Sequence, residues 1–158
     1  MIVLRYVYVV ALVVWVGGLI TIGSIVAPSA FAVLGAGPAP LAATLVGEVL
    51  RRFHLVGYMA AAVLLGTLLL MKVVGPRPPG FGFRLVLVGA MLLTTLVSGF
   101  WLDPQVAAVR AGAGVPINTL AADDERRVRF GWLHGLSTTL MAVTTLGGLV
   151  LCYWETRE

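Results

Sequence analysis

The segment from Phe130 to Trp154 reads FGWLHGLSTTLMAVTTLGGLVLCYW and contains no Asp, Glu, Lys or Arg. Such a run is long enough to cross the ~30 Å hydrocarbon core of a bilayer, which takes ~20 helical residues. Three other charge-free stretches, residues 6–47, 53–71 and 85–102, are also about long enough to cross it. The sequence lacks alternating strand patterns, and an open sheet could not satisfy its backbone in lipid. We therefore predict an all-α integral membrane protein with four transmembrane helices.

The composition supports the same class of protein. Of the 158 residues, 59% are hydrophobic and only 11% are charged, whereas about 25% are charged in a typical soluble domain. The net charge is +4, and the basic residues flank the apolar runs, as is usual for membrane spans. No basic stripe with interleaved aromatic residues is present, so we predict no nucleic-acid partner. Cys152 is the single cysteine, which excludes a disulfide within one chain.

Turn-forming residues divide the chain, a single domain over residues 1–158, into four helices. We expect them at about residues 3–33, 41–73, 83–110 and 119–154, arranged as an up-down-up-down bundle. The second helix carries Glu48 before its apolar part, so the helices should extend beyond the membrane on one side. Pro28 should bend the first helix, and Asn118 or Thr119 could cap the last one.

The distribution of basic residues suggests an orientation. With four spans, both termini and the turn between the second and third helices share one side. This turn carries Lys72, Arg77 and Arg84 and no acidic residue, although the total Lys and Arg counts of the two sides nearly tie. We expect both termini in the cytoplasm and the protein in the cytoplasmic membrane. The lipid bilayer is the expected partner, and Gly17 and Gly18 would permit close packing against another helix, of this chain or of a larger assembly.

Four polar residues are predicted to lie at one depth. From Lys72 back to His54 is 18 residues, or ~27 Å of helix. Counts from the inner edge to Ser24, Asp103 and His134 start at Arg5, Arg84 and Tyr153, respectively. Each count is 19 residues, or about 29 Å. The second and fourth helices are diagonal in such a bundle, so their histidines could face each other near the outer boundary.

Two diagonal imidazoles at equal depth favour axial ligation of a haem iron, one histidine from each side. Our leading hypothesis is a small b-type haem protein, with His54 and His134 as axial ligands, that transfers electrons or senses a small ligand. Arg51 and Arg127 share the helix faces of these histidines and could bind the haem propionates.

Other functions fit the same residues. His54, His134 and Asp103 together could bind a copper, zinc or iron ion in a binding or transport protein. Both histidines could instead form structural hydrogen bonds, and the protein could then be an accessory subunit of a larger membrane complex. No acid, base and nucleophile occur together in a recognisable motif, so we do not expect an enzyme.

Several segments resemble a known family. Trp101–Val106 followed by Phe130–Ser137, together with Trp15–Gly18 and Val49–His54, are similar to the transmembrane-protein-205-like family. Its members are small four-helix membrane proteins with a Phe-Gly-x-x-His-Gly-x-Ser motif. The resemblance implies the four-helix fold and no defined mechanism, and a eukaryotic member linked to platinum-drug resistance favours metal handling. The motif positions carried over to this chain are Pro104, His134, Gly135 and Ser137.

Overall fold

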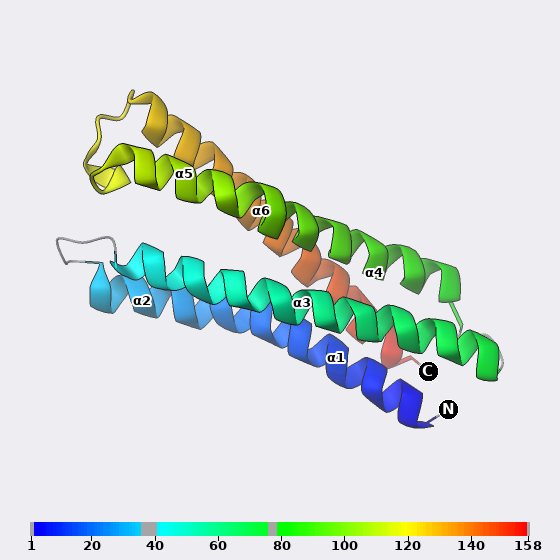
Figure 1. Ribbon diagram of the computed structural model, residues 1–158. Coiled ribbons are helices and arrows are strands. Elements are labelled where there is room, and N and C mark those ends of the chain that lie inside the picture. Colours follow the sequence, from blue (N-terminus) through cyan, green and yellow to red (C-terminus); the bar gives the residue numbers. More distant parts are fainter. Residues whose placement is uncertain (1, 36–40, 76–78, 158) are drawn as a thin grey trace.

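A computed structural model describes residues 2–35, 41–75 and 79–157, and shows four long helical spans (Figure 1). Residues 36–40, which belong to the turn expected between the first two helices, and residues 76–78, which include the basic residue Arg77, lie outside these ranges. The spans are α1 (Ile2–Thr21), η1 (Ile22–Val26) and α2 (Ala27–Leu34); α3 (Leu41–Val74); α4 (Phe81–Leu96), η2 (Val97–Leu102) and α5 (Asp103–Ala113); and α6 (Glu125–Glu155). Each of the four is long and apolar enough to cross a membrane. The predicted all-α, four-helix membrane bundle is confirmed.

The last helix begins later than the sequence suggested, at Glu125 instead of near residue 119. Asp124 is its N-cap, and its carboxylate accepts a hydrogen bond from the backbone N–H of Arg126. Thr119 instead ends a short 3-10 turn, η3 (Ile117–Thr119), in which its hydroxyl donates to the carbonyl of Pro116. A carboxylate at the N-cap also interacts favourably with the helix dipole, so the acidic residues define this helix start.

Two spans contain a π-helical segment just before a proline. Segment η1 ends at Val26, two residues before Pro28, and η2 ends at Leu102, two residues before Pro104. A proline donates no backbone hydrogen bond and crowds the preceding turn of the helix. A wider π turn is one way for a helix to continue through this disturbance, and such turns often occur at functional sites. At Pro28, where a bend was expected, the structure has a π segment just before the proline.

The half of the bundle at which both ends of the chain lie, called the inner half below and opposed to the outer half, is tightly packed (Figure 1). Helices α1, α3, α4 and α6 form a closed ring in which α3 and α6 are diagonal to each other, as predicted for the second and fourth spans. Their fully buried side chains form one apolar core: Tyr8, Leu12, Trp15, Leu64, Leu68, Val88, Met91 and Leu151. At the inner end, Glu155 of α6 pairs with Arg5 of α1 and Arg84 of α4.

Small residues permit the close helix contacts in this half. A Cβ atom added at Gly18 would collide with the ring of Phe53 on α3, and one added at Gly148 would collide with Val16 on α1. A Cβ atom at Gly17 would meet nothing within 4 Å. The two adjacent glycines predicted to be packing residues therefore differ, and only Gly18 is needed for packing within the chain.

The outer ends of the spans diverge into two pairs (Figure 1). Helix α2 packs on α3, and α5 packs on α6 around a second, smaller cluster that contains Leu102, Val109 and Leu133. The divergence leaves space between the two pairs, and the candidate site lies there.

Candidate functional site

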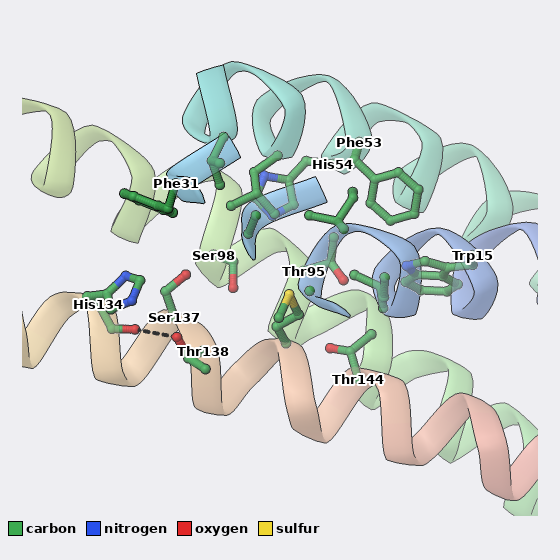
Figure 2. Close-up of a pocket in the computed structure, with 17 residues that line it drawn as sticks. Trp15, Phe31, Phe53, His54, Thr95, Ser98, His134, Ser137, Thr138 and Thr144 are labelled. Carbon is green, nitrogen blue, oxygen red and sulfur yellow. Dashed lines mark hydrogen bonds between the residues drawn. The ribbon is translucent and has the colours of Figure 1, made fainter. Parts of the chain in front are cut away.

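A cavity of about 280 Å³ lies between the two diverging helix pairs (Figure 2). This volume is near the lower end of the range for small-molecule sites, which are typically apolar clefts with a few convergent polar groups. The apolar part of its wall includes Leu19, Ile22, Phe31, Leu50, Phe53 and Met141. The polar part includes Trp15, His54, Thr95, Ser98, His134, Ser137, Thr138 and Thr144.

His54 enters the cavity wall from α3 and is held by a carboxylate. Its Nδ1 atom lies 3.0 Å from Oδ2 of Asp103, the first residue of α5, although the ring N–H is not aligned for a regular hydrogen bond. The backbone of Gly99 lies against the same ring, since an added Cβ atom would be 3.2 Å from Nδ1. Tyr58, one turn along α3, stacks near the imidazole with ring centroids 6.4 Å apart. The contact with Asp103 engages Nδ1 and leaves Nε2 as the nitrogen available to a ligand.

His134 lies on α6, on another wall of the same cavity (Figure 2). Its side chain is exposed, and its ring stacks on Phe130 with a centroid distance of 5.8 Å and an interplanar angle of 4°. The Phe130 ring has a second neighbour on α5: the guanidinium of Arg110 lies 5.1 Å from the ring centre. Arg110 also donates a hydrogen bond to the carbonyl of Ala43 on α3. Residues at the outer end thus connect His134 with both α5 and α3.

The structure brings some of the predicted layer together. The two histidines line one cavity, and Asp103 contacts His54. Ser24 does not line the cavity, because its hydroxyl is exposed and donates to the carbonyl of Ile20 in its own helix. Within residues 2–35, 41–75 and 79–157, no three His, Cys, Asp or Glu side chains are close enough together to hold a metal ion.

The two arginines expected beside a haem are placed elsewhere. Arg51 pairs with Glu48 one turn earlier on α3, with Nε 2.8 Å from Oε2. Arg127 donates from Nη1 to the carbonyl of Leu120 at 2.6 Å. Neither arginine lines the cavity.

The indole of Trp15 is a feature of the site for which the sequence predicted no binding role, although the Trp15–Gly18 segment was noted. Its side chain is fully buried, it lines the inner end of the cavity, and its Nε1 has no hydrogen-bond partner among the described residues. The hydroxyls of Thr95 and Thr138 donate to backbone carbonyls of their own helices and present only acceptor lone pairs to the cavity. Because Trp15 precedes two glycines in an apolar run, its pattern is also that of an ordinary packing residue.

Comparison with known proteins places the chain in a family. The sequence model of a family described as a domain of unknown function (DUF4149) matches residues 10–114, most of the chain, and this protein belongs to that family. No curated protein and no solved structure matches the chain. The matched region includes His54 and Asp103 and ends before His134.

Proposed function

We propose that this member of the DUF4149 family is an integral-membrane b-type haem protein, with His54 and His134 as axial ligands. The observation that carries the proposal is that these two histidines, 80 positions apart in the chain (134 − 54), line the same cavity from diagonal helices. Two imidazoles separated by a cavity suit a ligand that fits between them better than a single ion that must draw all its ligands to one point.

The environment of His54 suits an iron ligand. A histidine that binds metal usually presents its other ring nitrogen to a carboxylate or carbonyl, which fixes the ring and raises its basicity. The carboxylate of Asp103 lies 3.0 Å from Nδ1, close enough to take this role after a small rotation of the ring, and Nε2 would then be the coordinating atom. Phe31, Phe53 and Leu50 supply the apolar wall that a porphyrin face requires.

The size of the cavity constrains how haem would bind. A cavity of about 280 Å³ is small, so part of the macrocycle must extend through the opening of the cleft. Arg51 and Arg127 would bind propionates only after giving up their present partners, Glu48 and the Leu120 carbonyl. Bound haem would supply reversible one-electron chemistry or a binding site for a small ligand. The chain itself would orient the His54 ring through Asp103 and exclude water with its apolar walls.

An absorption spectrum of the purified protein tests this function. Protein expressed with ample haem should show a Soret band with low-spin features, and the band should be lost in His54→Ala and His134→Ala. Ser24→Ala is the control, because this nearby hydroxyl bonds only within its own helix and should leave the spectrum unchanged. Colourless wild-type protein would refute the proposal.

A second candidate is a binding or transport protein for a copper, zinc or iron ion. The contact between His54 and Asp103 favours it, because the two side chains already offer a nitrogen and an oxygen within 3.0 Å of each other. His134 would have to approach them to complete the site. Stoichiometric metal without haem in elemental analysis, lost in Asp103→Asn, would decide for this candidate.

We further propose that both termini lie in the cytoplasm and that the protein resides in the cytoplasmic membrane. The inner end of the bundle carries Arg5, Lys72 and Arg84, which supports this orientation. Reporter fusions at the C-terminus test this orientation, since a reporter that is active only outside the cytoplasm should be inactive when fused at the C-terminus.

Gly17 is the position at which a homo-oligomer or a larger complex could form a close contact, because an added Cβ atom would meet no other atom of the chain within 4 Å. If the protein is instead a structural accessory subunit, His54→Ala and His134→Ala should behave as the wild type does.

A further inference from the structure

We infer that the cleft opens sideways into the bilayer and takes its ligand from the lipid, through a mouth between α2 and α6. The inference rests on the proposed function in that the cleft is taken to be a binding site. It adds the class of ligand: a lipid-soluble or amphipathic molecule that partitions into the membrane before it binds.

The exposure of the residues that line the cavity locates the mouth. Gly23 and Phe31 of the first span are exposed, as are His134 and Thr138 of α6, so these residues form its two lips. By contrast, the lining residues at the inner end of the cavity are buried, and so are those on the far wall formed by α4 and η2: the first group is Trp15, Leu19, Ile22 and Thr144, and the second is Thr95 and Ser98. The cavity therefore reaches the surface along one edge of the bundle and is closed toward α4.

The opposite edge of the cleft is bridged by polar contacts. His54 of α3 meets Asp103 of α5, and Arg110 of α5 donates to the carbonyl of Ala43 on α3. No hydrogen bond or ion pair joins α2 to α6 within the described part of the chain. These contacts hold α3 and α5 together and close this edge of the cleft, while the α2–α6 edge is free for a ligand to pass.

The depths of Gly23 and Thr138 place the inner part of the mouth in the hydrocarbon. Gly23 lies 18 residues from Arg5, or ~27 Å along the helix, and Thr138 lies 17 residues from Glu155, or ~26 Å. Arg5 and Glu155 mark the inner charged layer, since they pair with each other. Gly23 and Thr138 therefore lie inside a ~30 Å core, so a molecule crossing between them comes from the lipid side, whereas Phe31 and His134, which are 26 and 21 residues from the same layer, lie at or beyond the outer boundary.

The inner limit of the mouth is also defined. A Cβ atom added at Gly23 would lie 3.3 Å from the Cε atom of Met141, so the first span and α6 meet again at this level. Below this contact, Gly148 and Val16 pack closely and seal the bundle. The mouth extends outward from Met141 toward Phe31 and His134, and a flat amphipathic molecule such as haem b could enter with its polar edge near the outer surface.

Haem loading from vesicles tests the inference with two adjacent threonines. Thr138 and Thr139 are both exposed, and each donates its hydroxyl to a carbonyl four residues earlier, but only Thr138 lines the cavity. With haemin dissolved in the lipid of the vesicles, Thr138→Trp should slow the appearance of the Soret band at least tenfold, and Thr139→Trp should not. The wild-type rate should follow the haemin content of the lipid. Equal rates in all three proteins, or a rate set only by haemin in the water, would overturn the inference while leaving haem binding intact.

A second pair of variants guards against misfolding of Thr138→Trp. Gly23→Trp places the same bulk on the opposite lip, and Ser24→Trp is its neighbour outside the cavity. Slow loading in both lip variants, with native helix content by circular dichroism, supports the mouth.

A probe that needs no haem separates this inference from the proposed function. An apolar phenyl diazirine dissolved in the bilayer should, on illumination, label the buried far-wall residues Thr95 and Ser98 in the wild type and in Thr139→Trp. The label should be lost in Thr138→Trp. If no Soret band ever forms but this pattern is seen, haem binding is wrong and the lateral mouth stands. If the far wall is not labelled in the wild type, the mouth is wrong.

Discussion

The ion-pair cluster at the inner end of the bundle should contribute far more to stability than other charge pairs of this chain. Glu155 accepts contacts from Arg5, whose Nε lies 3.1 Å from Oε2, and from Arg84. The side chains of Arg84 and Glu155 are only 3% and 9% exposed, while that of Arg5 is 43% exposed. Glu155→Gln would therefore remove the carboxylate charge that pairs with the buried Arg84 guanidinium.

Removing one partner of a buried ion pair costs about 3–5 kcal/mol. The glutamine oxygen still accepts a hydrogen bond, so we expect a loss near the lower limit, about 3 kcal/mol. Arg5→Gln breaks a contact that is partly open to solvent, and such pairs contribute about 0–1 kcal/mol. The two variants should therefore differ by about 2 kcal/mol or more in the free energy of unfolding.

A double-mutant cycle gives the cleanest measurement. Unfolding in mixed micelles, followed by circular dichroism, should show that Arg84→Met costs less than Glu155→Gln, because Glu155 keeps its ion pair with Arg5 in the Arg84→Met variant. The double variant should be close to Arg84→Met alone, which gives a large coupling energy. If Glu155→Gln and Arg5→Gln lose the same small amount, Arg84 is not a buried charge that depends on Glu155, and the reasoning is refuted.

Two further variants test the outer half of the molecule. Gly99→Ala should weaken haemin binding at least tenfold, because the added methyl group would collide with the Tyr58 hydroxyl and press on the His54 ring, whereas Gly135→Ala, with nothing within 4 Å, should match the wild type in the same titration. The pKa of Asp124 is lowered to about 2, chiefly by its side-chain hydrogen bond with Arg126, so its stabilising effect is present above the ordinary value of 3.8 and is lost as the pH falls toward 2. The melting temperature of Asp124→Ala should accordingly be lower than that of the wild type at pH 6, and the difference should shrink below pH 4; a constant difference would contradict this.

The sequence was sufficient to predict the fold because the charges mark the ends of the spans. Runs such as residues 130–154 cannot remain in water and cannot cross lipid except as helices, so four runs give four helices. The start of α6 was less predictable. Asn118, Thr119 and Asp124 are all good N-cap residues, and only the 3-10 turn after Pro116 shows which one is used.

Counting residues predicted heights in the bundle better than directions. His54, Asp103 and His134 were placed at one level, and the structure puts His54 beside Asp103 and both histidines on one cavity. Ser24 was placed at the same level but points away from the cavity. A residue count gives the rise along a helix axis, whereas the direction of a side chain depends on the exact turn of every preceding residue.

The two π segments explain both this failure and the position of the cavity. Each adds a residue to one turn, so the outer part of its span is rotated relative to a regular helix, and side chains beyond it point in directions that a 3.6-residue period does not predict. Ile22 and Gly23 of η1 and Ser98 of η2 all lie in the cavity wall. Both segments precede a proline by the same spacing, at Pro28 and Pro104. The helix pairs therefore diverge where the prolines disturb two spans, and a pair of prolines at similar depth is the sequence signal from which the cleft could have been inferred.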